Sequence, residues 1–446
     1  TLGDRIGRRR LLLIGATAFG TGSIFAAFST SAEMLIFARA LLGLAAATLA
    51  PSTLSLLSNM FHDPKERTFA IGVWISSFSA GGAIGPLIGG VLLAHFWWGS
   101  VFLIAVPVML LLLVLGPALL PEFRDPDAGR MDILSAALSL AAVLAVIFGI
   151  KHFAEHGLGW IPAVSILAGI LLAFVFARRQ NHLETPLIDL SLFKRPAFSA
   201  SLAVNILAFF VAFGSFLFVA QYLQLVLGLS PLEAGLWSAP SGIAFIAASL
   251  LTSRLLTFVR PPFAMAGGLV LAAIGFALLL WAGSTDSLAK VVVAYVIFSL
   301  GLAPVFTLTT DLIIGTVPPQ RAGTASGMAE TSSELGGAMG IALLGSVITA
   351  VYRNGIEANA PEGVTPELLS AARDTLGGAA SVAGSLGPSQ GDALLASARE
   401  AFTGGFMLVS LLCMVIALVA AFLAVVALRN VGHGQTEPSP APAPAE

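Results

Sequence analysis

Two acidic residues, Glu330 and Glu334, lie four positions apart in a long apolar stretch of the chain. Residues at this spacing share one face of a helix, where Gly337 adds a small residue. A carboxylate in a membrane costs about 2.5–3.5 kcal/mol, the value for Asp on an insertion scale. The membrane and the neighbouring acid therefore favour a protonated carboxyl group. Such a pair can hold a proton near neutral pH and release it when a cation arrives. The alternative is a pair that hydrogen-bonds to neighbouring helices and serves packing.

Two further charged residues, Asp311 and Arg39, fall inside apolar stretches. Asp311 follows a threonine-rich turn near the expected inner end of its stretch. It is either a proton relay or substrate contact, or a residue of the membrane interface. Arg39 lies about two helical turns into its stretch, and a buried arginine normally needs a partner. A structural ion pair near the outer interface is one interpretation of Arg39.

The composition requires that these groups be positioned by membrane helices. Of the 446 residues, 57% are hydrophobic and 10% are charged, where soluble domains carry roughly a quarter. A soluble globular domain and a disordered chain are both excluded. The single cysteine, Cys413, excludes an intramolecular disulfide and a Cys-ligated zinc site. With a net charge of −2, the chain lacks the excess of basic residues that is typical of proteins that bind nucleic acids. The chain is predicted to be an all-α polytopic membrane protein.

Twelve apolar runs are long enough to cross a bilayer core of about 30 Å as helices. Several gaps between them contain only a few residues, so neighbouring helices must be antiparallel. The runs are residues 11–29, 32–58, 68–94, 98–120, 132–150, 160–177, 197–220, 232–252, 263–283, 288–314, 323–351 and 402–428.

The basic residues predict the orientation of these helices. Most of the 22 Lys and Arg residues fall in gaps on the side of the Arg8–Arg10 cluster, which is therefore expected to be cytoplasmic. The outer gaps contain only Lys151, Lys290, Arg353, Arg373 and Arg399.

Two hydrophilic segments lie outside the runs. Residues 353–400 form a long outer segment with helical spacing around Pro366 to Leu376. This segment is either a solvated acidic loop or a small cap over an exit path. Residues 431–446 are rich in Pro, Ala, Ser and Glu and are expected to form a disordered tail.

A charged motif opens the chain. Residues 2–10 read Leu-Gly-Asp-Arg-Ile-Gly-Arg-Arg-Arg, in which Asp4, Arg5, Gly7, Arg8 and Arg9 are the candidate functional residues. A carboxylate and several guanidinium groups at helix ends can pair with the charges and dipoles of neighbouring helices. Such a latch can form in one conformation and break in another. The alternative is a plain positive-inside anchor.

A second motif, rich in glycine, spans residues 81–90. It places Gly81, Gly85, Pro86, Gly89 and Gly90 on one helix. Small residues four apart let helices approach closely, while proline removes a backbone donor and bends the helix. A bent, closely packed helix can control how two bundles rock. The alternative is ordinary glycine-mediated packing.

These two motifs resemble signatures of the major facilitator superfamily. The first is similar to G-x-L-a-D-r-x-G-r-r-r, and the second fits the G-x-x-x-G-P-x-x-G-G signature of its drug:proton antiporters. Arg39 to Gly43 is similar to R-x-x-Q-G, with Leu42 in place of Gln. The whole chain resembles the fourteen-helix branch that includes QacA-like and SmvA-like quaternary-ammonium exporters. In that layout two helices precede Thr1, which leaves 12 of an expected 14.

The resemblance implies a domain organisation of two six-helix bundles with an inserted helix pair. Residues 1–120 would be the remainder of the N-terminal bundle, and residues 121–195 the inserted pair with its cytoplasmic linkers. Residues 196–430 would be the C-terminal bundle, which carries the outer segment 353–400.

The resemblance also assigns roles to candidate residues. QacA-like exporters carry acids at the positions of Glu330 and Glu334, and the superfamily ties the arginine at the position of Arg39 to proton coupling. Asp311 is a further candidate for proton coupling, on the ground of its own place in an apolar stretch rather than of the resemblance. By analogy a mid-membrane cavity is lined by the run that contains Asn205, Phe209, Phe213 and Phe216. Aromatic faces and carboxylates suit lipophilic cations. Each phenylalanine can instead face lipid or serve packing.

The implied function is a proton-coupled multidrug efflux antiporter that exports lipophilic or quaternary-ammonium cations by alternating access. It would work as a monomer in the bacterial cytoplasmic membrane. The alternative is a proton-coupled exporter of a specific metabolite, amino acid or antibiotic.

Enzymatic chemistry finds little support in the sequence. There is no P-loop with Lys-Ser/Thr and no Gly-x-Ser-x-Gly motif, and the six histidines fall in gaps or at helix ends. An intramembrane hydrolase would need catalytic groups on facing helices, which Glu330 and Glu334 on one helix do not supply. No cofactor, metal or nucleic acid is expected, and a membrane enzyme or receptor is the competing class.

Overall fold

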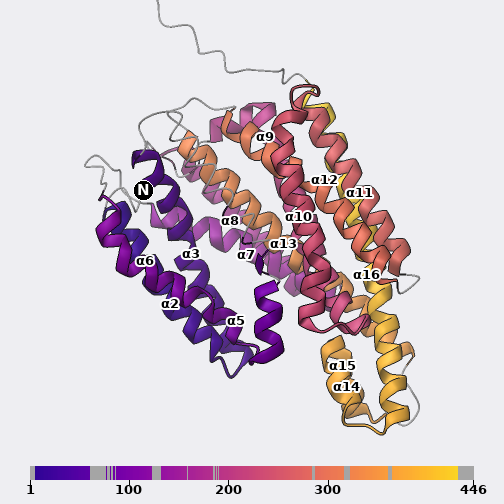
Figure 1. Ribbon diagram of the computed structural model, residues 1–446. Coiled ribbons are helices and arrows are strands. Elements are labelled where there is room, and N and C mark those ends of the chain that lie inside the picture. Colours follow the sequence, from indigo (N-terminus) through magenta and orange to yellow (C-terminus); the bar gives the residue numbers. More distant parts are fainter. Residues whose placement is uncertain are drawn as a thin grey trace, which may run out of the picture. The chain divides into compact units, whose positions relative to one another are not determined.

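The computed structural model describes residues 6–60, 77, 81, 84–85, 87–122, 132–157, 159–183, 186, 188, 190–283, 287–315, 322–359 and 364–429. Within these ranges every regular element is helical (Figure 1). The N-terminal elements are α2 (Arg8–Ala27), α3 (Ala32–Met60), α5 (Ser100–Leu103), α6 (Ala105–Leu119), α7 (Ile133–His156) and α8 (Trp160–Gln180). They are followed by η1 (Leu190–Lys194), α9 (Pro196–Gln221), η2 (Tyr222–Val226), α10 (Pro231–Leu255), α11 (Pro261–Gly283), α12 (Leu288–Gly315), α13 (Ala322–Ala358), α14 (Pro366–Asp374), α15 (Leu376–Ala383) and α16 (Pro388–Leu428).

The predicted helical membrane fold is confirmed. Eleven segments of the described chain are long and apolar enough to cross a membrane, and they coincide with eleven of the twelve predicted runs. Most of the remaining run, residues 68–94, lies outside the described residues, although residues 87–95 within and after it are helical.

The two helices that flank residues 364–387 are longer than the apolar runs predicted. Helix α13 continues to Ala358 and α16 begins at Pro388, whereas the runs predicted an end at residue 351 and a start at 402. The 41 residues of α16 extend about 60 Å at 1.5 Å per residue, twice the thickness of a bilayer core. Hydropathy marks only the part of a helix that crosses the membrane, so the polar extensions gave no signal.

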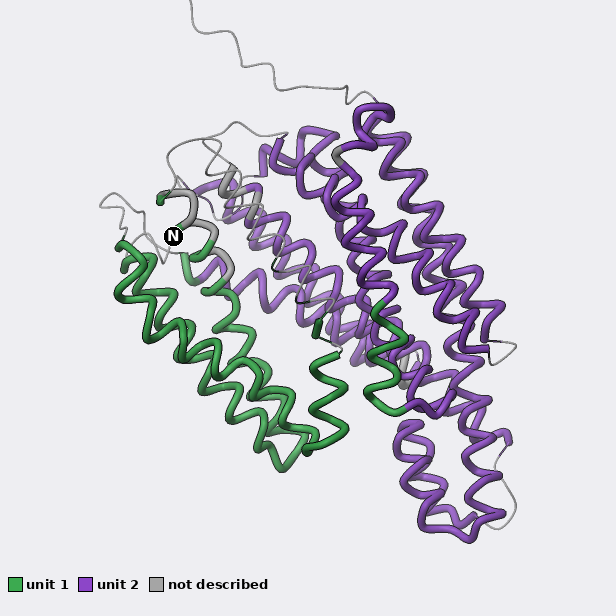
Figure 2. The backbone as a smooth tube through the Cα atoms, in the orientation of Figure 1, with its two compact units in different colours: residues 1–133, 230–239 green, residues 134–229, 240–446 purple. Residues whose placement is uncertain are grey.

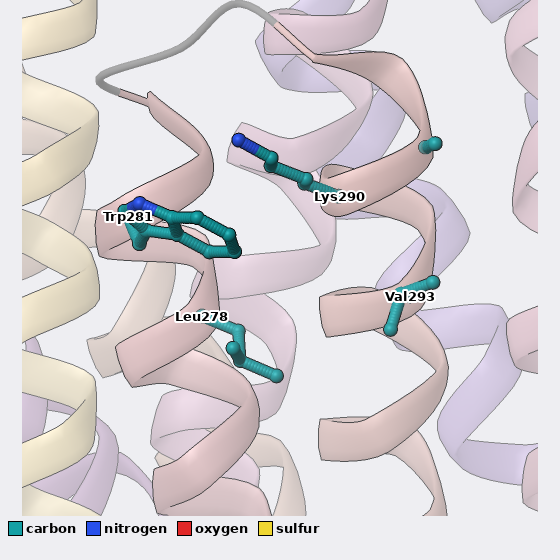
Figure 3. A pocket seen from close by; sticks show the side chains of 5 residues that line it. Leu278, Trp281, Lys290 and Val293 are labelled. Carbon is teal, nitrogen blue, oxygen red and sulfur yellow. The ribbon is translucent and has the colours of Figure 1, made fainter.

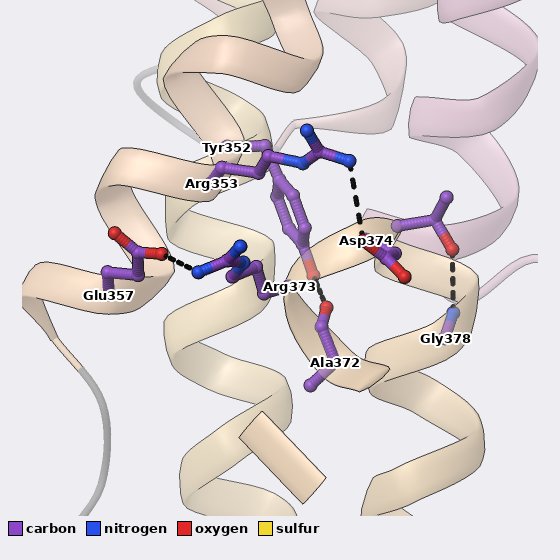
Figure 4. A network of polar contacts seen from close by, with 8 residues as sticks. Tyr352, Arg353, Glu357, Ala372, Arg373, Asp374 and Gly378 are labelled. Atoms are coloured by element: carbon purple, nitrogen blue, oxygen red, sulfur yellow. Dashed lines mark hydrogen bonds and ion pairs between the residues drawn. The ribbon is translucent and has the colours of Figure 1, made fainter. Parts of the chain in front are cut away.

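The outer segment folds as helices between these two extensions. Its predicted helical stretch is confirmed as α14, which is followed by α15. The hydroxyl of Tyr352 on α13 donates a hydrogen bond to the backbone oxygen of Ala372 at 2.8 Å (Figure 4). Arg353 pairs with Asp374 at 3.3 Å, and Arg373 on α14 pairs with Glu357 on α13. The segment is therefore a fixed helical hairpin, which we call the outer hairpin (residues 364–387).

The described chain divides into two compact units (Figure 2). Unit 1 contains residues 1–133 and 230–239, and unit 2 contains residues 134–229 and 240–446. In unit 1, α2 packs against α3 and α6, and a buried apolar cluster forms around Ala26, Ala38 and Leu42.

Glycines bring the helices of unit 2 into backbone contact. Helix α13 presents Gly336 and Gly340 to α9, where an added Cβ would overlap the carbonyl oxygens of Ile206 and Phe210. Gly268 of α11 and Gly301 of α12 face each other in the same way. Helices in lipid associate by such close van der Waals packing, because burial of apolar surface supplies no driving force there.

Candidate functional site

The three embedded acids all belong to unit 2 and have exposed side chains. Glu330 and Glu334 lie on α13, and Asp311 lies near the end of α12. Within the described part of the chain, none of these carboxylates has a hydrogen bond or ion pair. The described helices therefore offer no hydrogen-bonding or ionic partner for these three exposed carboxylates.

Two of the candidate phenylalanines pack directly against the helix that carries the acids. The ring of Phe213 lies over Gly337, which is one helical turn beyond Glu334, and Phe209 contacts Gly336. The Phe213 side chain is 42% exposed, so part of its ring face is available. The helical turn of α13 that follows Glu334 therefore packs against aromatic rings of α9.

The aromatic group continues into residues that the sequence did not single out. Phe209 stacks on Phe306 of α12, with ring centroids 4.1 Å apart, and Phe306 contacts Phe245 of α10 at 5.7 Å. Phe216 lies elsewhere, against Phe298 at 5.7 Å. Phe306 and Phe245 stand in uniformly apolar runs, where nothing in the sequence distinguishes a stacked ring from one that faces lipid.

Asn205 differs from the phenylalanines because its side chain is fully buried. Its amide nitrogen lies 2.7 Å from the hydroxyl of Ser332 and 2.9 Å from that of Ser333, both on α13. Its amide oxygen accepts a hydrogen bond from Thr309 of α12 at 2.7 Å. Asn205 therefore connects α9 to α12 and to α13, the helix that carries Glu330 and Glu334.

Arg39 lies on α3 of unit 1, with an exposed side chain and no ion pair to a described residue. Its neighbour Leu42, which replaces the glutamine of the superfamily motif, is buried against α2, close to Gly22. Residues 39 and 42 therefore serve different faces of α3, and a leucine at 42 is suited to apolar packing.

The charged motif at the start of the chain forms a defined contact with the end of α6. The Arg9 side chain donates hydrogen bonds to the backbone oxygens of Leu120 at 2.9 Å and Pro117 at 3.3 Å. Its backbone nitrogen donates to the carboxylate of Glu122 at 3.1 Å, and its guanidinium lies 3.7 Å from the same group. A cation at the carboxyl end of a helix is favoured by the helix dipole.

Gly7 allows this contact to form. Its φ of +108° is a conformation that residues with a side chain rarely adopt, and the Glu122 carboxylate occupies the space of a Cβ. Arg8 begins α2, while Asp4 and Arg5 lie outside the described residues. The sequence did not single out Glu122, whose only signal was its place directly after an apolar run.

We expect the Glu122→Gln substitution to weaken this contact, because it removes the charge that pairs with Arg9 and Arg10 and keeps the shape. Half-exposed ion pairs contribute about 0.2–1 kcal/mol, so a conformational equilibrium that depends on the contact should change by a factor of about 1.4 to 5. Initial transport rates in everted vesicles would measure this change. Glu367→Gln on the exposed outer hairpin is the matched control, and equal rates in both variants would contradict a role for the contact.

The glycine motif is partly described. Residues 81, 84, 85 and 87–95 are helical, and Pro86 lies outside the described residues. A Cβ at Gly90 would lie 2.8 Å from the backbone of Pro231 and Leu232, within unit 1, so this glycine is required by a close helix approach. Gly81, Gly85 and Gly89 would meet no described atom within 4 Å.

Two grooves in unit 2 contain none of the candidate residues. One, of about 190 Å³, lies between α11 and α12, where the Lys290 ammonium stands 3.9 Å above the Trp281 ring (Figure 3). The other, of about 490 Å³, is lined mainly by apolar residues of α10, α11, α12 and the α10–α11 connection. Among the described residues, no three His, Cys, Asp or Glu side chains are close enough to hold a metal ion.

Many long apolar helices and glycine-mediated helix contacts define a polytopic helical membrane protein. The sequence model of the Major Facilitator Superfamily matches residues 1–341, and the chain belongs to this superfamily. The predicted resemblance is thereby confirmed.

Similar proteins carry transport-related names. The chain is 43% identical to the multidrug efflux pump LfrA of Mycolicibacterium smegmatis, over 96% of this chain and 85% of the relative. It is 35% identical to the methyl viologen resistance protein SmvA of Salmonella typhimurium, over 90% of this chain and 81% of the relative. It is 32% identical to the tetracenomycin C resistance and export protein of Streptomyces glaucescens, over 100% and 84%.

Solved structures show the same fold at low sequence identity. An inward-facing, occupied bacterial homologue of the human lysosomal transporter Spinster matches with a TM-score of 0.61 and 19% identity, over 96% of this chain and 83% of that chain. An auto-inhibited peptide transporter of the POT family also matches with a TM-score of 0.61, at 14% identity, over 98% and 86%.

Proposed function

We propose that the protein is a proton-coupled multidrug efflux antiporter that exports lipophilic or quaternary-ammonium cations across the bacterial cytoplasmic membrane. The observation that carries this proposal is the pair of unpartnered acids, Glu330 and Glu334, beside the exposed face of Phe213. The relatives named as a multidrug efflux pump and a methyl viologen resistance protein support it. Methyl viologen is an organic dication.

The chemistry follows from competition for the carboxylates. A proton arriving from outside neutralises Glu330 or Glu334, and a lipophilic cation arriving from the cytoplasm or inner leaflet displaces that proton. The cation is held by the carboxylate charge and by the faces of Phe209 and Phe213. A proton and a cation compete for the same carboxylates, so the protein carries either a proton or a cation each time it changes between outward-facing and inward-facing states. The result is exchange of protons for cations. Asp311 and Arg39 are the remaining candidates for the proton path.

Proton release on addition of a cation tests this function. The full-length protein in detergent would receive ethidium, benzalkonium or methyl viologen while a pH dye reports released protons, and everted vesicles would report transport. We expect release that saturates with substrate and persists without ATP. A protein that releases no proton with any of these cations would contradict the proposal.

A second candidate, export of a specific antibiotic or other metabolite, is favoured by the similarity to the tetracenomycin C export protein. The same assay distinguishes the two candidates. Proton release with neutral or anionic aromatic antibiotics, and none with the cations, would support the second candidate.

A further inference from the structure

The Asn205 amide is the centre of a buried polar cluster that joins three helices. With 0% of its side chain exposed, its nitrogen donates to the hydroxyls of Ser332 and Ser333 and lies 3.3 Å from the backbone oxygen of Ala329. Its oxygen accepts from Thr309 at 2.7 Å. Both ends of the amide are therefore engaged by protein, and no polar atom of it remains for a substrate.

Apolar packing encloses Asn205, Thr309 and Ser332, which are at most 4% exposed, whereas Ser333 lies at the edge of the cluster and is partly exposed. Near the start of α9, Phe198 belongs to one buried cluster with Ile313 of α12 and Met328 of α13. One and two helical turns beyond Ser332 on α13, Gly336 and Gly340 bring this helix into backbone contact with α9. Hydrogen bonds are stronger in such a low-dielectric environment, and a group left without a partner is costly there.

The cluster and the acids occupy different faces of α13. Ala329, Ser332, Ser333 and Gly336 share the face toward α9. At 3.6 residues per turn, Glu330 and Glu334 lie about 100° and 140° around the helix from Ala329. Fixing the first face therefore fixes the direction in which the carboxylates point.

The same relation holds on α12. Thr309 binds Asn205, and Asp311 follows two residues later, about 200° around the helix. One amide on α9 thus constrains the rotation of both helices that carry embedded acids.

We propose that Asn205 is a positioning residue for proton coupling rather than a substrate contact: it fixes the rotation of α12 and α13 relative to α9. This proposal deepens the proposed function and rests on it. It reassigns Asn205, which the sequence placed among the cavity-lining residues.

The Asn205→Leu substitution tests the role without creating an unpaired group. Ser332 and Ser333 keep their hydrogen bonds to the Ala329 oxygen at 2.7 and 3.0 Å, and Thr309 keeps its bond to the Val305 oxygen at 2.9 Å. Leucine keeps the branch of asparagine at Cγ but has a larger volume, so the thermal unfolding of this variant in detergent is measured together with its transport. Thr309→Val breaks the hydrogen bond to the Asn205 oxygen with almost no change in volume and therefore separates loss of the connection between the helices from overpacking.

We expect Asn205→Leu to lower the maximal transport rate about tenfold and to move the pH of half-maximal transport, with KM changed less than about threefold. The rate change corresponds to the strongest hydrogen-bond couplings measured between membrane helices. Thr309→Ser, which retains the hydroxyl, should behave as the parent, and Thr309→Val should change the rate in the same direction as Asn205→Leu. A raised KM with an unchanged rate and pH profile would instead show a substrate contact and overturn the proposal, as would parent-like transport.

A labelling experiment tests the orientation of α13 independently of transport. Cys413, the one cysteine of the chain, is buried, so Glu330→Cys introduces a single accessible thiol. We expect Asn205→Leu to change the rate of its reaction with a hydrophilic maleimide about threefold or more, while a cysteine at Glu367 reacts unchanged. Equal rates at position 330 with and without Asn205 would overturn the positioning role. If the parent releases no protons, the proposed function fails whatever the labelling shows.

Discussion

Replacing either Glu330 or Glu334 with glutamine is expected to abolish substrate-coupled proton release and to reduce export at least about tenfold. Glutamine preserves the size and hydrogen-bonding capacity of the side chain, but it cannot take up and release a proton. Both carboxylates are exposed and have no partner among the described residues, so each is free to bind the exchanging ligands. Removing the charge therefore removes the exchange and leaves the surrounding packing in place.

Protein stability separates this loss of function from misfolding. Because no described ion pair or hydrogen bond is broken, the melting temperature of either variant should equal that of the parent or exceed it slightly. A slight rise would reflect the lower cost of a neutral group in the membrane.

The measurement is proton release in detergent, beside ethidium export from everted vesicles, for the parent and both variants. Glu400→Gln, an exposed acid on the outer part of α16, is the matched control and should behave as the parent. Export that persists at the parental rate in both Glu330→Gln and Glu334→Gln would refute the acid-pair mechanism.

The membrane helices were predictable because hydropathy records the single strongest constraint on this chain. A segment in lipid must satisfy its backbone hydrogen bonds internally, so each long apolar run becomes a helix. The polar extensions of α13 and α16 obey no such constraint. They are held by contacts such as the hydrogen bond from Tyr352 to Ala372, which involve side chains far apart in the sequence.

The individual residues of the candidate site could be predicted from the sequence, but the hydrogen bonds and contacts that join them across helices could not. An embedded acid such as Glu334 is conspicuous because charge is rare and costly in a membrane helix. Asn205 was also conspicuous as a polar residue, yet its engagement with Thr309 and Ser332 depends on the packing of three helices. Glu122 became important only because α6 ends beside Arg9, which no local pattern reveals.

The second large effect is expected at Gly340, where α13 meets α9. A Cβ at this position would overlap the carbonyl oxygen of Phe210 and lie 2.9 Å from its carbonyl carbon. These atoms belong to the backbone of another helix and cannot rotate away, so Gly340→Ala must separate the two helices. Overpacking of this kind typically costs about 1–3 kcal/mol, and here it also displaces the helix that carries the acids.

Thermal unfolding in detergent would measure the cost of Gly340→Ala, with Gly327→Ala as its control on the same helix. A Cβ at Gly327 would meet no described atom within 4 Å, so only the conformational preference of the residue changes there. Since alanine favours a helix interior by about 0.5–1 kcal/mol over glycine, Gly327→Ala should be as stable as the parent or more stable. Gly340→Ala should melt several degrees lower and export more slowly. Equal melting temperatures for the two variants would mean that α9 and α13 do not need their backbone contact, and that the acids of α13 are positioned by other interactions.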